Sequence, residues 1–150
     1  MKLSRASTYA FYGLAYIAGQ PEGRFVPLSE IHNRYDVPEK HLAKIFQLLV
    51  KAGILESARG VNGGFALAKP ANRISPLDVI RILEGPIRES GCLLLEEDCD
   101  FHGTCGINAV WGRAQHAMLT VLRQATLADM ADAPGKRIRP PLVKLHRKTP

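Results

Sequence analysis

All three cysteines of the chain lie in one short segment, GCLLLEEDCDFHGTC, over residues 91–105. Cys92, Cys99 and Cys105 are separated by six and by five residues, and His102 lies between the last two. These spacings match no CxxC zinc knuckle, while soft thiolate ligands suit an iron-sulfur cluster or zinc. A clustered, odd number of thiols in a reducing compartment therefore predicts metal binding or redox activity before it predicts a disulfide framework.

Length and composition set the context for these thiols. The chain has 150 residues, of which 46% are hydrophobic and 23% are charged, which fits one globular domain or a small domain with an appendage. No run approaches the roughly 18 apolar residues of a membrane span, and the N-terminus lacks the layout of a signal peptide. We expect a cytoplasmic protein with no membrane partner.

The net charge of +6 is concentrated at one end of the chain. Residues 136–150 carry six Lys or Arg and no acid, which equals the whole excess of positive charge. Residues 81–105, by contrast, hold two basic and six acidic side chains. A solvated basic tail is common, so the total charge alone is a weak indication of nucleic-acid binding, and the positions of the charges matter more.

Three helices are predicted in the first 53 residues. The first lies between Leu3 and Ile17, the second begins near Pro27 and ends at Tyr35, and the third begins near Pro38 and ends before Gly53. The tight connection between the second and third helices predicts a helix-turn-helix. The apolar stripe of the third helix is formed by Leu42, Ile45, Phe46 and Leu49.

The opposite side of the third helix carries polar residues at steps of four, three and four. These residues are Lys40, Lys44, Gln47 and Lys51, with His41 close by. They project together. On this helix alone, a merely solvated face and a DNA-contacting face are both reasonable interpretations.

The next segment favours the second interpretation. Ile54–Leu55 and Phe65–Leu67 resemble strands, and a glycine-rich turn that contains Arg59 and Asn62 joins them. A glycine-rich tip allows close approach to a phosphate backbone, and Arg59 could enter a minor groove. Helix, turn, basic helix and hairpin in this order predict a winged helix-turn-helix, which is a mainly α fold with a small β wing.

Two further segments complete the expected organisation. Ser75–Asp78 forms a capping-box pattern that begins a helix, which Gly85 ends, and Thr126–Asp129 forms a second such pattern that predicts a short terminal helix. Between them lies the longest apolar repeat, formed by Ile107, Trp111, Ala114, Met118, Val121 and Ala125. Its spacing is that of a coiled-coil seam. A homodimer explains so continuous a seam better than packing within one copy, and its two recognition helices would suit a palindromic site.

We therefore divide the chain into four parts. A winged helix-turn-helix DNA-binding domain is expected over residues 1–85 and a cysteine-containing sensor loop over 86–105. The dimerisation helix and a short terminal helix follow over 106–132. A basic tail, expected to be disordered, occupies 133–150.

The quoted motifs, read together, resemble a known family. LSRASTYAFYGLAYIA, AGILESARGVNGGFALA, ISPLDVIRILEG, the three cysteines and TLADM are similar to the Rrf-type transcriptional regulators, from Lys2 to about Asp132. The resemblance implies a dimeric bacterial transcription factor that binds double-stranded DNA. In one branch, which includes the iron-sulfur cluster regulator and the nitric-oxide-sensing repressor, the cysteine loop holds an iron-sulfur cluster of two or four irons.

The fourth cluster ligand is not identified by the resemblance. The positions that carry a histidine or an acidic ligand in the two cluster-binding relatives fall on Asn108 and Thr8, and the first cysteine gap is one residue longer here. His102 is the best local candidate. Solvent, a small thiol or a carboxylate such as Asp100 are the alternatives.

The functional hypothesis is a repressor whose DNA affinity depends on a cluster at Cys92, Cys99 and Cys105. Its DNA contacts are expected from the polar face of the third helix and from Arg59 and Asn62. A metal-free thiol switch and a zinc-stabilised loop use the same cysteines, and a winged helix that binds only protein is a further alternative. An enzyme is not expected, because no nucleophile–base pair is indicated and no GxxxxGK phosphate loop is present.

Overall fold

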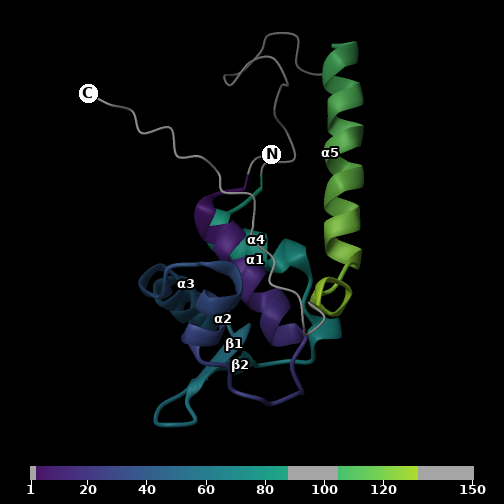
Figure 1. Cartoon of the computed structure of the whole chain (residues 1–150). Coiled ribbons are helices and arrows are strands. Elements are labelled where there is room, and N and C mark those ends of the chain that lie inside the picture. Colours follow the sequence, from purple (N-terminus) through teal and green to yellow (C-terminus); the bar gives the residue numbers. More distant parts are fainter. Residues whose placement is uncertain (1–2, 88–104, 132–150) are drawn as a thin grey trace, which may run out of the picture.

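The computed structural model describes residues 3–87 and 105–131 (Figure 1). These residues form a mainly helical structure with one two-stranded antiparallel sheet, as the sequence predicts. The elements are α1 (Arg5–Ala18), α2 (Leu28–Tyr35), α3 (Glu39–Lys51), β1 (Leu55–Ala58), β2 (Gly64–Leu67), η1 (Ala71–Arg73), α4 (Pro76–Glu84), α5 (Gly106–Gln124) and η2 (Leu127–Met130).

The core forms where α1 and α3 cross. Leu42, Phe46 and Leu49 of the predicted α3 stripe are fully buried, and Ile45 is 7% exposed. At Gly13 of α1, an added Cβ would lie only 2.4 Å from Cζ of Phe46. The absence of a side chain at Gly13 therefore allows the Phe46 ring to lie directly against α1.

The turn between α2 and α3 is short and well defined. Asp36 ends α2 in the left-handed conformation, with φ of 56°, and its N–H donates to the carbonyl of His32. Val37 is buried, and Pro38 is the N-cap of α3. Asp36 can take this conformation because Asn and Asp tolerate it better than most residues. The short turn between α2 and α3 confirms the predicted helix-turn-helix.

The wing is held to the domain by a short backbone bridge. β1 and β2 pair from Leu55 with Leu67 to Ala58 with Gly64, and Val26 forms a two-hydrogen-bond bridge with Phe65. Gly64 has φ of 150°, and a Cβ there would lie 2.3 Å from the carbonyl oxygen of Val26. Glycine at this position therefore permits the bridge.

The end of α4 is tied to the start of α1. The predicted Ser75–Asp78 capping box is present. At the other end of the helix, the Glu84 carboxylate accepts hydrogen bonds from the Ser7 hydroxyl and the Ser4 backbone N–H. These bonds lower the pKa of Glu84 below its ordinary value of 4.5.

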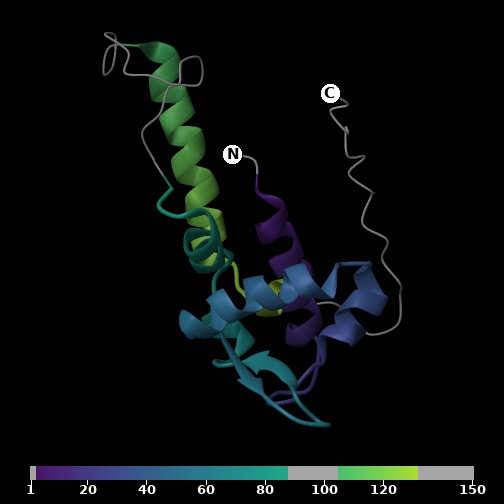
Figure 2. The ribbon, with the colours of Figure 1, turned by 90° about the vertical axis from the view of Figure 1, so that its left-hand side faces the viewer.

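Helix α5 rises beside the domain and projects beyond it (Figures 1 and 2). Its base is anchored by two buried leucines, Leu119 within the helix and Leu127 after it, and the Leu127 N–H donates to the Ile74 carbonyl at 2.9 Å. The second predicted capping box, at Thr126, is present, but it begins a 3₁₀ turn. One seam assignment is wrong, because Ala125 is the C-cap of α5 and has extended backbone.

Within residues 3–87 and 105–131, no helix is both long enough and apolar enough to cross a membrane.

Candidate nucleic-acid interface

The polar face of α3 is open to solvent. Its five predicted contact residues, Lys40, His41, Lys44, Gln47 and Lys51, are all exposed. The opposite stripe of α3 packs into the core, so the helix cannot turn this face inward without exposing Phe46 and its neighbours. The packing of α3 therefore fixes a row of three lysines, one histidine and one glutamine at the surface.

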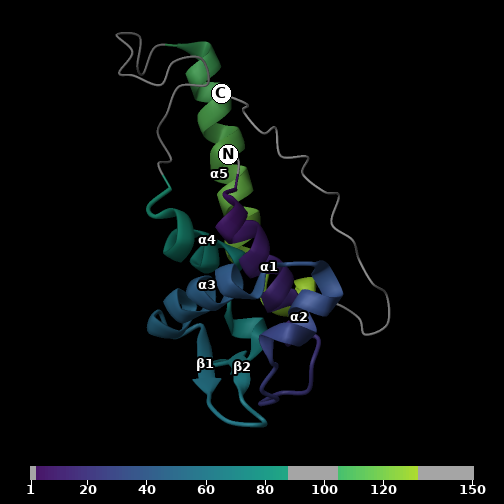
Figure 3. The ribbon, with the colours of Figure 1, turned by 60° about the vertical axis from the view of Figure 1, so that its left-hand side comes forward.

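The wing extends the same surface. Its tip, residues 59–62, is exposed, and the turn is closed by a hydrogen bond from the Gly63 N–H to the Gly60 carbonyl at 2.9 Å. Figure 3 shows α3 above the two strands of the wing. Figure 2 shows α3 across the front of the domain with the wing below it, whereas α5 lies on the other side in Figure 1. The wing, whose tip carries Arg59 and Asn62, thus lies beside α3 and away from α5.

Among the residues that the structure describes, no acid forms an ion pair with the cations of this surface. The structure records one salt bridge among the residues it describes, and it joins Arg24 to Glu30 at 2.8 Å, outside the wing and α3. Within the same residues, Lys40, Lys44, Lys51 and Arg59 therefore have no carboxylate within ion-pair distance. Uncompensated positive charge along one face favours the approach of a polyanion.

Two exposed apolar residues also lie on this surface, and the sequence analysis did not assign them. Leu48 of α3 is 51% exposed, and Val61 at the wing tip is fully exposed. The sequence did contain a signal for Leu48, because it follows Lys44 by four positions and precedes Lys51 by three, on the polar side of the helix.

The predicted metal ligands lie mostly outside the described residues. Cys92, Cys99 and His102 belong to that part of the chain, and so does the candidate Asp100. Cys105 is described: it is the N-cap residue of α5, is partly exposed and is not in a disulfide. Over residues 3–87 and 105–131, no group of three or more His, Cys, Asp or Glu side chains could hold a metal.

Along most of its length, α5 exposes apolar side chains in a regular row. Ile107, Val110 and Val121 are 49%, 58% and 64% exposed, and Ala114 and Ala117 between them are also exposed. We call these five residues the α5 stripe. Trp111 and Met118, which the predicted seam placed at its centre, are half-buried at the edge of the stripe.

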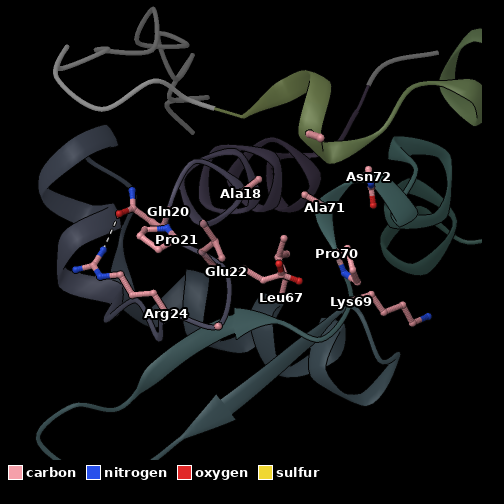
Figure 4. Close-up of a pocket in the computed structure, with 13 residues that line it drawn as sticks. Ala18, Gln20, Pro21, Glu22, Arg24, Leu67, Lys69, Pro70, Ala71 and Asn72 are labelled. Carbon is pink, nitrogen blue, oxygen red and sulfur yellow. Dashed lines mark hydrogen bonds between the residues drawn. The ribbon is translucent and has the colours of Figure 1, made fainter.

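A hollow of about 280 Å³ lies away from both surfaces, between the α1–α2 connection, the end of β2 and the two 3₁₀ turns (Figure 4). Arg24 lines this hollow, and its guanidinium donates hydrogen bonds to Glu30 and to the Gln20 amide oxygen, at 2.8 Å each. Hydrogen bonding to Glu30 raises the pKa of Arg24 above its ordinary value. Because this guanidinium already has hydrogen-bond partners, we assign no ligand and no reaction to the hollow.

Comparison with known proteins agrees with this geometry. The profile of the Rrf2 family, described as an iron-dependent transcriptional regulator, matches residues 3–133. The structure of CymR, the global cysteine regulator of B. subtilis, is 28% identical with a TM-score of 0.72, over 88% of this chain and 99% of that one. The oxidized form of Staphylococcus aureus CymR is 28% identical with a TM-score of 0.69, over 91% and 100%.

A further similar solved structure is that of an IscR protein. IscR of T. potens is 32% identical with a TM-score of 0.62, over 87% of this chain and 85% of that one. The family profile covers most of the chain and the exposed basic surface lies on its winged domain. The protein therefore belongs to the Rrf2 family of DNA-binding transcriptional regulators and is not an enzyme.

Proposed function

We propose that this Rrf2-family regulator is a homodimeric repressor whose affinity for a palindromic operator is controlled through its cysteines. The observation that carries the DNA-binding part is the open cationic face of α3 beside an exposed wing. Neither surface is covered by the described remainder of the chain.

The side chains of α3 and the wing make two kinds of contact with DNA, to phosphates and to bases. Lys40, Lys44 and Lys51 are charged donors without directional specificity, so they suit phosphate oxygens. His41 and Gln47 lie among them and carry donor and acceptor groups that can read base edges in the major groove. From the wing, Arg59 and Asn62 contact the neighbouring groove.

The second copy packs along the α5 stripe. The five stripe residues follow one another at steps of three and four, which is the spacing of a two-helix seam. Trp111 and Met118 then close the seam on the side of the parent domain. Two copies joined in this way present two α3 helices to half-sites about 34 Å apart.

An iron-sulfur cluster fits the donor set of the sensor segment. Cys92, Cys99 and Cys105 supply soft thiolates, with His102 as the fourth ligand. When bound, the cluster supplies a centre whose gain, loss or oxidation responds to the cell's redox and iron state. Cys105 is the N-cap of α5, where the positive end of the helix dipole favours a negatively charged group. A change in its bonding acts directly on the end of the dimer helix.

A metal-free thiol switch is the second candidate. It is favoured by the likeness to CymR, a cysteine regulator of which an oxidized form has been solved. In that case oxidation joins or modifies the cysteines and no metal is needed.

The decisive experiment combines anaerobic purification with DNA binding. We expect visible absorbance with stoichiometric iron and sulfide, and loss of all three after replacement of any one cysteine by Ala. Binding to its own promoter fragment, followed by fluorescence anisotropy, should weaken as salt rises. A colourless, iron-free protein whose binding responds to peroxide and dithiothreitol would replace the cluster with the thiol switch. Stoichiometric zinc with indifference to oxidants would indicate a structural loop.

A further inference from the structure

Exposed large apolar side chains are concentrated in two places. Within residues 3–87 and 105–131 they are Leu48, Val61, Ile107, Val110, Val121 and Met130. Three of them lie on the α5 stripe, where a second copy covers them. Leu48 and Val61 lie instead inside the basic surface, at the two parts of the molecule that the proposed function brings to DNA.

Leu48 is surrounded by groups that suit a duplex. On the surface of α3 it neighbours Lys44, one turn before it, and Lys51, one turn after it, while Gln47 precedes it in the chain. Leu49 and Ile45 fill the core beneath, so the exposed half of Leu48 has no place inside the domain. A partner that neutralises the two lysines also covers Leu48. Flanking cations favour a polyanion over a protein surface as that partner.

The major groove offers one apolar feature to such a side chain. The C5 methyl group of thymine projects there, and apolar side chains that touch it distinguish thymine from the other bases. Gln47, which is assigned to base edges, and Leu48 both neighbour Lys44 on the exposed side of α3, so both belong to the surface that meets the duplex.

Val61 occupies a different position. It is at the outermost part of the wing turn, fully exposed, between Arg59 and Asn62. The minor groove has no methyl groups, and its walls are formed by sugars. An apolar contact there adds affinity without selecting a base.

We propose that this regulator reads DNA partly through apolar contacts, with Leu48 packed on a thymine methyl in the major groove and Val61 packed on sugars beside the wing. The inference rests on the proposed interface of α3 and the wing. It adds a sequence preference, thymine beneath Leu48, that the charged and amide residues do not supply.

The test removes only methyl groups from the DNA. Duplexes that bind the full-length protein are selected from a random-sequence pool, and each thymine of the selected site is replaced in turn by uracil. For the wild type, one substitution in each half-site should weaken binding about fourfold, the value expected for burial of one methyl group. The same two duplexes are then titrated with Leu48→Ala, Lys44→Ala and Val61→Ala.

Each variant has its own expected pattern. Leu48→Ala should bind the thymine duplex more weakly and lose the difference between thymine and uracil. Lys44→Ala should weaken both duplexes and keep the difference. Val61→Ala should weaken both by a few-fold with an unchanged salt slope. Leu48→Met, which preserves an apolar side chain of similar volume, should restore the difference. The thermal midpoint of each variant is measured first, and an unchanged midpoint is expected because all three positions are exposed.

Two failures can be told apart. If Lys44→Ala weakens binding but Leu48→Ala leaves the methyl effect intact, or no thymine shows one, the apolar contact is overturned and the interface stands. If no duplex is selected, or if neither Lys44→Ala nor Leu48→Ala changes affinity, the interface itself is wrong. In that case Leu48 belongs to a protein-binding surface.

Discussion

α3 and α5 are both amphipathic helices, but they leave opposite sides uncovered. The apolar stripe of α3 is buried in the core and its open side carries lysines and polar residues. α5 buries only Leu119 and leaves a row of aliphatic side chains in solvent. α3 buries its apolar stripe within one copy, and its open side is suited to a charged ligand. α5 still has apolar surface to bury, and a second copy of the same helix would bury it.

This difference between α3 and α5 predicts that different residues control the stability of one copy and the association of two copies. Removing apolar atoms from the buried stripe of α3 should damage the fold of a single copy, whereas changing the α5 stripe should leave that fold intact and alter association. Polar changes on α3 should affect neither and should act on DNA alone.

The largest expected effect is in the core beneath α3. Phe46→Ala should lower the free energy of unfolding by about 3–5 kcal/mol, because it empties the space against Gly13 and removes the edge contact with Phe65. Urea denaturation measures this. Gln47→Ala, the exposed neighbour, should change stability by less than about 0.5 kcal/mol. Equal losses in the two variants would contradict the assigned faces of α3.

The next effect is on association. Val110→Glu combined with Val121→Glu places charges in the proposed seam and should raise the dimer dissociation constant at least about 30-fold, equivalent to about 2 kcal/mol. Sedimentation velocity over a concentration series reports this. His116→Glu introduces the same charge at an exposed position outside the stripe and serves as the matched control. A double variant that remains dimeric at the wild-type concentration would exclude the α5 stripe as the interface.

Smaller effects are expected on DNA binding. Lys44→Ala should weaken binding to every sequence and reduce the salt slope by about 0.9, since one phosphate contact is lost. Gln47→Ala should cost about 1–3 kcal/mol on the preferred site and little on other sites, with the slope retained. Anisotropy titrations at several salt concentrations distinguish the two. Parallel losses on all sequences with no change of slope would show that the face is misassigned.

The smallest effect is expected where the end of α4 is tied to the start of α1, through the hydrogen bonds that Ser7 and Ser4 donate to Glu84. Because the folded-state pKa is lowered, the carboxylate stabilises the fold above the ordinary pKa of 4.5, and this contribution is lost as the pH falls through the lowered value. Glu84→Gln should therefore reduce the thermal midpoint slightly at about pH 6 and narrow the fall in midpoint between about pH 6 and about pH 3. An identical fall in both proteins would mean that Glu84 contributes nothing to the acid response.

Local chemistry made most of the winged domain predictable. Pro27, Pro38 and the Ser75 capping box mark helix starts, and Gly53, with φ of 71°, follows the end of α3. Each of these signals acts within one or two turns of its own position. The exposure of the five polar α3 residues followed from the same period that buried Phe46.

The errors arose where a residue's neighbours are distant in the sequence. The apolar arc of α5 is broad enough to serve both its own domain and an open face, so heptad spacing could not show that Trp111 and Met118 lie at the border. The Val26–Phe65 bridge spans 39 positions and involves a single residue on one side, which gives no periodic signal. Leu48 was missed for another reason: it was assigned to neither face, because the exposed side of the helix was recognised from its polar residues alone.

The anchoring of α5 at its base has a mechanical consequence. Leu119 and Leu127 hold the lower end in the hydrophobic interior, while Cys105 is 14 residues above Leu119, about 21 Å along the axis. A rigid helix anchored in this way would tilt about its buried end. A sideways step of about 3 Å at its tip corresponds to a tilt of only about 8° at the pivot. In the proposed function, a displacement of this size at Cys105 would therefore reach the winged domain as a rotation of only a few degrees.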